Sequence, residues 1–271
     1  MPLLKCIIPP VVTAKVVTQR WIPACAGMTG GCGAAGDMNP MPALELSAVT
    51  KTFTMHLQGG LRLPVLNDVS FTVAPGQCVA LTGPSGTGKS SILKLIYGNY
   101  KCDTGRILVD IGGRVVDIAS AQPRQILTIR QRALGYVTQF LRAVPRVSAL
   151  DIVAEPLLSK GVAREEATSR AKDMLRRFNV PERLWSLPPA TFSGGEQQRI
   201  NLARGLLPEH PILLLDEPTA SLDAHNRAVV VELVRERKAR GTAIVAIMHD
   251  DDVRDAVADI NVDVTRFAIA A

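Results

Sequence analysis

Aromatic residues and long apolar runs are scarce in this sequence of 271 residues. Phe, Trp and Tyr together make up 4% of the chain, so a surface that stacks nucleic-acid bases on aromatic rings is not expected. No apolar run approaches the roughly 18 residues that a membrane-spanning helix needs. If this protein acts at a membrane, we expect other chains to cross it. The net charge of +6 permits a polyanionic partner without requiring one.

Cysteines are also few, and they are unevenly placed. Three of the five lie in the first 37 residues, which leaves Cys78 and Cys102 for the rest of the chain. These two do not have the spacing of a metal site. The chain also has too few cysteines for radical iron–sulfur chemistry. This pattern suits a reducing, cytoplasmic compartment.

The first 37 residues differ in composition from the rest of the chain. They contain two prolines at 9–10 and a Gly/Ala-rich tail from 27 to 36. Prolines, Lys15 and Arg20 interrupt their apolar part, which makes a poor secretory signal. We therefore expect residues 1–37 to be a non-native or disordered extension, with Met38 or Met41 as the working start. Residues 38–271 are then expected to form the functional domain.

A phosphate-binding loop is the clearest motif of the chain. The stretch is Gly83-Pro84-Ser85-Gly86-Thr87-Gly88-Lys89-Ser90, which fits G-x-x-x-x-G-K-[ST] at every fixed position. An apolar strand at 78–82 precedes it and an amphipathic helix at 91–97 follows it, as the motif requires. Backbone N–H groups of the loop and the positive end of the helix would bind phosphate oxygens. Lys89 is predicted to reach the β- and γ-phosphates, and Ser90 to bind Mg²⁺.

The order of the apolar segments predicts an α/β fold. Alternating strands at 44–49 and 69–73, with a hairpin turn at 112–113 further on, predict an antiparallel set. Fully apolar strands at 134–138, 212–216 and 242–248 alternate with helices, which predicts a mostly parallel sheet covered on both faces. Helical periodicity without a convincing strand from 148 to 189 predicts an inserted helical lobe, at about residues 140–192.

Two adjacent carboxylates end the apolar strand at 212–216. Open α/β sheets bind their ligands at this edge. Asp216 could hold Mg²⁺, and Glu217 could polarise the water that attacks a γ-phosphate. The alternative is an ordinary polar strand end, but the phosphate loop upstream favours the functional interpretation.

A second glycine-rich turn lies at Ser193-Gly194-Gly195-Glu196-Gln197. Ser193 and Glu196 form a capping box, so a helix is predicted to begin here and to continue towards Leu206. A helix start and nothing more is the simplest interpretation. A helix start with two glycines is also an anion site. The chain already has one triphosphate-binding loop. We therefore expect the second turn to cover a nucleotide that is bound by another subunit.

Taken together, these motifs resemble those of ATP-binding cassette (ABC) ATPases. The matching pieces are Gly83–Ser90 (Walker A), Gln139 (Q-loop), Ser193–Gln197 (signature), Ile212–Glu217 (Walker B), Ser221–Asp223 (D-loop) and His249 (switch histidine). They follow the order and spacing of that family over residues 44–264. The resemblance implies the P-loop NTPase fold of an ABC nucleotide-binding domain, with a mostly parallel core sheet, an antiparallel β subdomain and an inserted α-helical lobe. It also implies ATP hydrolysis with Mg²⁺ by a dimer.

The resemblance further implies roles for single residues. Glu217 and Lys89 would be catalytic, and His249 would contact the γ-phosphate and hold Glu217 and the attacking water. Ser90, Gln139 and Asp216 would bind Mg²⁺, and Gln139 would link the nucleotide state to the helical lobe. Phe53 would stack on adenine, with a core-facing Phe as the alternative. The expected nucleotide-binding set is Phe53, Gly83, Pro84, Ser85, Gly86, Thr87, Gly88, Lys89, Ser90, Ser91, Gln139, Ser193, Gly194, Gly195, Glu196 and Asp223.

Short local strings favour one branch of the family. Residues 57–60, 97–100, 139–147 and 203–205 resemble the PhnL-type subunit of the bacterial carbon–phosphorus lyase system for phosphonate degradation. This resemblance implies a cytoplasmic ATPase that partners with the lyase core complex and with a second cassette subunit, either another copy or a K-type subunit. Phe140–Val147 is then the expected coupling surface.

Two alternatives to the lyase subunit stay open. One is the ATPase of a lipoprotein-release or macrolide-type exporter, which would lie against the inner membrane through its partners. The other is a cassette protein associated with DNA or ribosomes. It is less favoured, because no aromatic or basic cluster marks a nucleic-acid groove.

Overall fold

The computed structural model describes residues 41–55, 59–141 and 145–268. The chain divides into two units, Met1–Asn39 and Pro40–Ala271, and all described residues belong to the second. The expected extension at 1–37 therefore lies outside the described residues. So do residues 142–144 of the expected coupling surface.

Four strands form an antiparallel sheet. They are β1 (Leu44–Met55), β2 (Leu61–Val73), β4 (Thr104–Asp110) and β5 (Val115–Asp117), in the order β2-β1-β4-β5. The first two are longer than the alternating segments 44–49 and 69–73 predict. Their pairing continues from Leu44↔Val73 to Met55↔Leu61 through shifts in register. Such shifts move apolar residues off a strict alternation, so the sequence pattern ends before the strands do.

Five strands form a parallel sheet. They are β3 (Cys78–Thr82), β6 (Leu134–Val137), β7 (Ile212–Asp216), β8 (Ala243–Ile247) and β9 (Ile260–Asp263), in the order β6-β7-β8-β3-β9. Alternate residues of β7 enter different cores. Leu213 and Leu215 pack among helices on one face, whereas Ile212 and Leu214 pack with the antiparallel sheet and the helix after β3 on the other. Two buried faces explain why this strand is apolar throughout.

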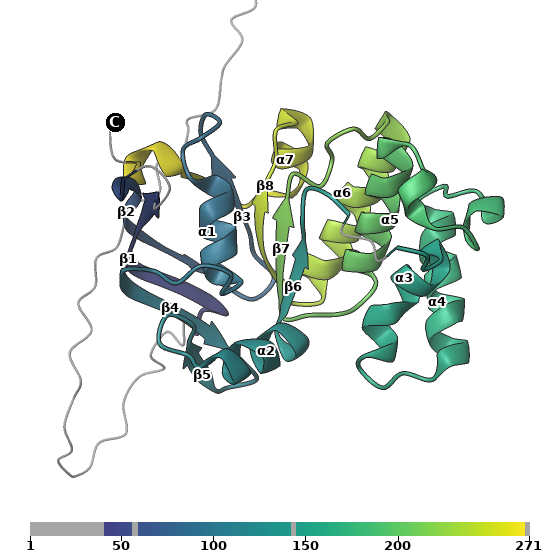
Figure 1. Cartoon of the computed structure of the whole chain (residues 1–271), viewed down its shortest axis with the longest axis horizontal. Helices are drawn as coiled ribbons and strands as arrows, with labels where there is room; N and C mark the ends of the chain where they lie inside the picture. Colours follow the sequence, from purple (N-terminus) through teal and green to yellow (C-terminus); the bar gives the residue numbers. More distant parts are fainter. Residues whose placement is uncertain (1–40, 56–58, 142–144, 269–271) are drawn as a thin grey trace, which may run out of the picture. The chain divides into compact units, whose positions relative to one another are not determined.

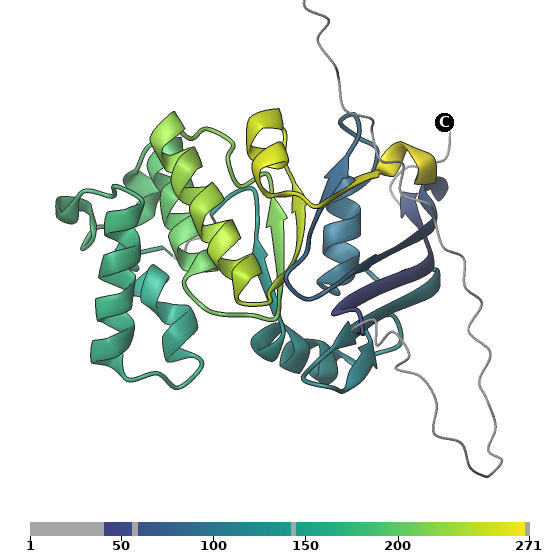
Figure 2. The same ribbon diagram turned by 180° about the vertical axis from the view of Figure 1, so that it is seen from behind.

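Helices cover both faces of the parallel sheet. On the face shared with the antiparallel sheet lies α1 (Lys89–Ile96), and α2 (Pro123–Arg132) precedes β6 (Figure 1). The other core includes residues of α3 (Ala149–Leu158), α4 (Arg164–Arg177), α5 (Gly194–Leu206), α6 (Ala224–Ala239) and α7 (Asp251–Val257), and Figure 2 shows α6 and α7 from behind. The short turns η2 (Glu182–Leu184), η3 (Pro189–Thr191) and η4 (Val264–Phe267) complete the fold. None of the helices in the described part of the chain is long and apolar enough to cross a membrane.

Candidate nucleotide site

The phosphate loop connects β3 to α1 at the carboxyl edge of the parallel sheet. Gly88 caps α1 with a φ of 98°, a backbone conformation that side chains rarely adopt. A Cβ at this position would also lie 2.8 Å from a side-chain carbon of Leu66. Residues 83–86 are exposed. The loop therefore presents its backbone to solvent at the N-terminus of a helix, where anions bind.

Lys89 folds over this loop. Its ammonium donates hydrogen bonds to the carbonyl oxygens of Gly83 and Pro84, both at 2.7 Å, and the residue is only 8% exposed. The hydroxyl of Thr87 donates to the carbonyl of Pro84 at 2.9 Å. None of the ion pairs formed by the described residues includes Lys89. Its charge is therefore balanced only by carbonyl dipoles, which an anion can replace.

Asp216, the last residue of β7, accepts two hydroxyl groups. Ser90 Oγ donates to its Oδ1 at 3.0 Å, and the hydroxyl of Tyr136 donates to its Oδ2 at 3.0 Å. Burial raises the pKa of the Asp216 carboxyl, and the hydrogen bonds from Tyr136 and Ser90 oppose that rise. Tyr136 is not among the residues that sequence motifs predict. Its role depends on where β6 places its hydroxyl, which the pattern of an apolar strand does not reveal.

The donor atoms around Asp216 suit Mg²⁺. They are the hydroxyl of Ser90 and the carboxylate of Asp216, hard oxygen ligands of the kind that Mg²⁺ prefers. In the described part of the chain, no group of three or more His, Cys, Asp or Glu could hold a metal ion. Mg²⁺ is commonly held by one or two protein oxygens together with substrate phosphates. These residues therefore fit an ion that arrives with a nucleotide.

Glu217 brings two other predicted residues together. Its Oε2 accepts a hydrogen bond from Gln139 Nε2 at 2.8 Å, and its Oε1 lies 2.7 Å from His249 Nε2. Its backbone N–H donates to the carbonyl of Ile247, and its φ of 53° lies in the left-handed region. Strained backbone of this kind is frequent at functional sites. The side chain of Gln139 thus contacts Glu217 and not the Ser90–Asp216 pair.

A set of polar contacts near Glu217, here called the Asp250 clasp, joins Thr219 and Arg227 to Asp250 and was not predicted from the sequence. The hydroxyl of Thr219 donates to Asp250 Oδ2 at 2.6 Å, and Arg227 Nη1 lies 3.3 Å from Asp250 Oδ1. Together with Glu217 and His249, these residues line a pocket of about 190 Å³. The signal in the sequence is weak, because only two features could suggest it: Asp250 directly follows His249, and Thr219 lies two residues after Glu217. The clasp joins the segment after β7 to the segment after β8.

The second glycine-rich turn is a capped helix start. Ser193 Oγ and Ser193 N–H both donate to Glu196 Oε2, at 2.8 and 2.9 Å. A Cβ on Gly195 would lie 3.4 Å from the carbonyl of Ser221, so this turn lies against the D-loop of its own chain. Asp223 caps α6 and accepts the N–H of Asn226 at 2.8 Å, which lowers the pKa of its carboxyl. Among the described residues, no hydrogen bond joins the turn to the phosphate loop of the same chain.

Phe53 lies on β1, in the antiparallel sheet. Its ring meets Tyr100 edge-on with the centroids 5.1 Å apart, and Lys51 Nζ lies 5.1 Å from its centroid. The ring is half-buried. These contacts are with neighbouring side chains and do not test the stacking of Phe53 on adenine, which stays a prediction.

A large groove includes the carboxylate of Asp216 in its lining. It measures about 1180 Å³, and its lining includes Ser90, Tyr136, Asp216, Lys160 and Arg204. Two exposed apolar side chains, Leu127 and Phe140, belong to the same lining. The expected coupling residue Phe140 therefore lies at a surface that is continuous with the nucleotide site.

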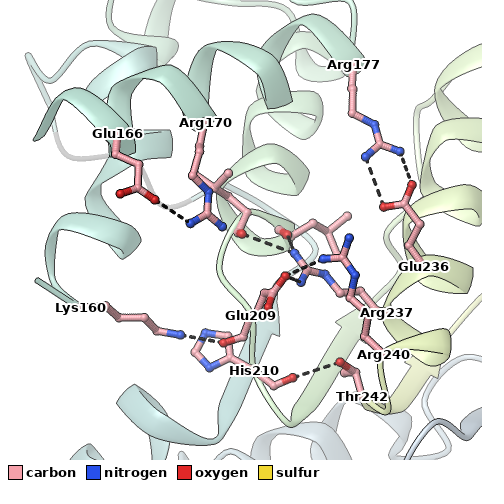
Figure 3. A network of polar contacts seen from close by, with 12 residues as sticks. Lys160, Glu166, Arg170, Arg177, Glu209, His210, Glu236, Arg237, Arg240 and Thr242 are labelled. Atoms are coloured by element: carbon pink, nitrogen blue, oxygen red, sulfur yellow. Dashed lines mark hydrogen bonds and ion pairs between the residues drawn. The ribbon is translucent and has the colours of Figure 1, made fainter. Parts of the chain in front are cut away.

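A separate polar network joins α6 to the end of α5 and to the loop that follows it (Figure 3). Glu209 Oε1 lies 3.0 Å from Arg237 Nη1 and 2.6 Å from Arg240 Nη1. The buried Arg237 also donates to the carbonyl of Leu206. Next to it, burial lowers the pKa of His210 to about 4, and its Nδ1 is buried without a hydrogen-bond partner.

Comparisons with known proteins identify relatives of the chain. Residues 66–220 match the family model described as ABC transporter. The lipoprotein-releasing system ATP-binding protein LolD of Shewanella sp. (strain MR-4) is 37% identical over 208 residues, which cover 76% of this chain and 87% of LolD. The ABC transporter ATP-binding protein YtrE of Bacillus subtilis is 34% identical over 212 residues, which cover 78% of this chain and 90% of YtrE.

The chain spans only part of a third relative. The macrolide export ATP-binding/permease protein MacB of Marinobacter nauticus is 33% identical over 216 residues, which cover 80% of this chain but 32% of MacB. Among solved structures, the dimeric ATP-binding cassette MJ0796 in a post-hydrolysis state, bound to ADP and Pi, has a TM-score of 0.73 and 30% identity. The match covers 82% of this chain and 95% of MJ0796. The predicted fold class is confirmed.

The predicted membership of the carbon–phosphorus lyase system is wrong, and with it the lyase core complex as partner. The relatives are named for lipoprotein release, macrolide export and ABC transport, which favours the exporter alternative. Two residues of the short segments that suggested the lyase have local packing roles. A Cβ on Gly205 would collide with the side chain of Val137, and Tyr97 packs on Tyr136 with the ring centroids 5.0 Å apart. Packing within the chain accounts for these two residues, so their presence does not identify the partner of the chain.

Proposed function

Because this chain belongs to the ABC transporter family and is an ATPase that binds ATP with Mg²⁺, we propose that it powers a transporter of the lipoprotein-release or macrolide-export type. One observation carries the proposal. Lys89, Ser90 with Asp216, and Glu217 with Gln139 and His249 gather at one edge of the parallel sheet. The names of the relatives support the class of transporter.

The phosphate loop and Lys89 bind the phosphates of ATP in this proposal. Backbone N–H groups at the start of α1 face the phosphate oxygens, and the ammonium of Lys89 exchanges the carbonyls of Gly83 and Pro84 for phosphate. When bound, Mg²⁺ neutralises charge on the phosphates, and Ser90 and Asp216 are the residues that would hold it.

Glu217 acts as the general base. Its carboxylate orients the attacking water and accepts its proton, a role worth about 10²–10⁴-fold in rate. His249 and Gln139 each contact one oxygen of this carboxylate, so they fix its direction. Because Gln139 also lies next to Phe140 at the groove, it is the residue through which a groove partner would act on Glu217.

A second cassette completes the site. ABC ATPases dimerise, as the related MJ0796 does. In this chain, Ser193 and Gly194 are exposed at the start of α5, where a helix N-terminus favours an anion. We place this turn over the ATP held by the phosphate loop of another subunit.

The groove receives a segment of a separate membrane subunit. Its exposed Phe140 and Leu127 offer apolar contacts, and its lining also includes Glu155 and Pro156 of α3. The protein then lies against the membrane through this partner. The Phe140→Asp variant should keep the ATPase activity of the isolated chain while it reduces the amount of protein recovered with membranes.

The test of the proposal is the Glu217→Gln variant. It should bind ATP, hydrolyse it at least a hundredfold more slowly, and elute as a dimer in size-exclusion chromatography with ATP. The Ser193→Arg substitution should abolish that dimer while the single chain still binds ATP. Hydrolysis by Glu217→Gln at the parent rate would contradict the assignment of the base.

A further inference from the structure

The two oxygens of the Asp216 carboxylate are held by different parts of the chain. Ser90, at the start of α1, donates to Oδ1, and Tyr136, on β6, donates to Oδ2, each at 3.0 Å. Ser90 belongs to the phosphate-loop motif, whereas Tyr136 belongs to none of the motifs found in the sequence. The second holder of this carboxylate is therefore a feature of the fold that the motifs do not explain.

The position of the Tyr136 hydroxyl is fixed from two sides. The strand β6 pairs with β7 in parallel, with Tyr136 opposite Leu214, two residues before Asp216. The ring of Tyr136 packs on the ring of Tyr97 with the centroids 5.0 Å apart, and the guanidinium of Arg130 lies 4.4 Å from the Tyr97 ring centroid. A ring held by its strand and by this stack leaves the hydroxyl little freedom to move away from Asp216.

Asp216 needs such support because it is only 5% exposed. A buried carboxylate oxygen that loses its donor is left without compensation for the water that it gave up. The carboxylate would then turn towards the donors that remain. A group that orients a metal ligand in this way usually affects metal affinity by 10–100-fold.

We propose that Tyr136 is a positioning residue for the metal carboxylate, whose hydroxyl holds Asp216 Oδ2 so that Oδ1 stays beside Ser90 Oγ. The proposal rests on the proposed function in one respect, which is that the site takes ATP with Mg²⁺. Tyr136 also lines the groove. The residue that aims the metal carboxylate is thus part of the surface assigned to the membrane subunit.

The Tyr136→Phe variant tests the assignment, with Tyr97→Phe as the matched control. Each substitution removes one phenolic hydroxyl and keeps the ring of the same aromatic stack. The affinity for a non-hydrolysable ATP analogue is measured by calorimetry with Mg²⁺ and with EDTA. Binding of Mn²⁺ to the complex of protein and analogue is measured by electron paramagnetic resonance.

For Tyr136→Phe we expect the affinity in EDTA to stay within about twofold of the parent, while the gain in affinity from Mg²⁺ falls about tenfold. The Mn²⁺ affinity should fall by the same factor, and Tyr97→Phe should match the parent in all three measurements. An unchanged gain from Mg²⁺ in Tyr136→Phe would overturn the assignment. An equal loss of affinity with and without Mg²⁺ would also overturn it, because that result shows a packing role only.

These outcomes differ from a failure of the proposed function. If the parent chain does not bind the analogue under either condition, both the proposed function and the role of Tyr136 are wrong. If the parent binds it more tightly with Mg²⁺ and Tyr136→Phe does the same to an equal extent, only the role of Tyr136 is wrong.

Discussion

Two clusters of polar side chains join segments that are far apart in the sequence. One lies at the nucleotide edge, and the other joins α6 to the end of α5 and the loop after it (Figure 3). At the nucleotide edge, Glu217 is held by single contacts from Gln139 and His249, and the His249 side chain is 53% exposed. In the other cluster, the buried Arg237 contacts a carboxylate and a backbone carbonyl together. Glu217 can therefore exchange its His249 partner at little cost, whereas the buried Arg237 cannot exchange its partners in this way.

The difference is one of desolvation. Groups that stay near water lose little when a partner leaves, because water replaces that partner. Groups that are fully buried lose a partner without replacement, so their networks hold segments in fixed positions. Substitutions in the two clusters should therefore separate activity from stability, and the predictions below run from the largest expected effect to the smallest.

Removing Arg237 should destabilise the fold most. The Arg237→Ala substitution leaves Glu209 without its buried partner and the carbonyl of Leu206 without a donor. Glu209 is 58% exposed and keeps Arg240, so the main loss comes from the buried carbonyl, which costs about 1–3 kcal/mol when it is left unpaired, and the midpoint of urea unfolding should fall clearly. The matched control is Arg240→Ala, because Arg240 contacts the same Glu209 oxygen but is 59% exposed. It should cost less than about 1 kcal/mol. Equal losses in the two variants would contradict the comparison.

Removing His249 should slow ATP hydrolysis but leave the stability of the fold nearly unchanged. In His249→Ala, Glu217 keeps Gln139 as a partner, but its second oxygen is no longer held. We expect ATP hydrolysis to slow about a hundredfold, which corresponds to about 2.7 kcal/mol in the activation barrier. Thermal unfolding should stay within about 0.5 kcal/mol of the parent, since the side chain is largely exposed. The exposed His225 provides the control, and its replacement by Ala should leave both quantities unchanged.

His210 should make the stability of the fold depend on pH. Burial, together with the positive charges of Lys160 and Arg237, lowers the pKa of this imidazole to about 4. An unfolded histidine titrates near pH 6.5. The folded state therefore resists protonation, and its stability is full above about pH 6.5 and declines as the pH falls towards 4.

The loss assigned to His210 is about 2 kcal/mol, below the full value for this pKa difference because the residue is partly exposed. Urea unfolding of the parent and of His210→Gln at pH 7 and pH 5 measures it. The parent should lose more stability than the variant between these two pH values. The same loss in both proteins would show that other groups cause the pH dependence.

The comparison also shows what the sequence can predict. Residues of the nucleotide edge lie in contiguous motifs, so Gly83–Ser90 could be predicted from its spacing, and Asp216 and Glu217 from their place at the end of an apolar strand. Tyr136 and Asp250 were not, since their roles depend on how strands and loops are placed in space. The network around Arg237 was missed for the same reason.

Secondary structure was predictable where apolar periodicity is strong. The helices at 149–158 and 194–206 and the strand at 212–216 were found, because each contributes several buried residues. The helix α2 was missed, and Ile129 is its only buried residue, so it has no apolar face to detect. The partner system was predicted wrongly because it was inferred from residues such as Gly205. A side chain at this position would collide with Val137, so packing within the chain explains the glycine and the partner does not.

The smallest effect is expected for an exposed ion pair on α4. Glu166 and Arg170 lie four residues apart with 3.6 Å between Oε1 and Nη1, and their side chains are 61% and 41% exposed. Figure 3 also draws this pair. Water and salt screen such pairs, which contribute about 0.3–0.5 kcal/mol on a helix surface. Glu166→Ala should therefore change the free energy of unfolding by less than about 0.5 kcal/mol, and added salt should reduce the difference further. A loss comparable to that of Arg237→Ala would mean that exposure does not separate structural from exchangeable contacts in this molecule.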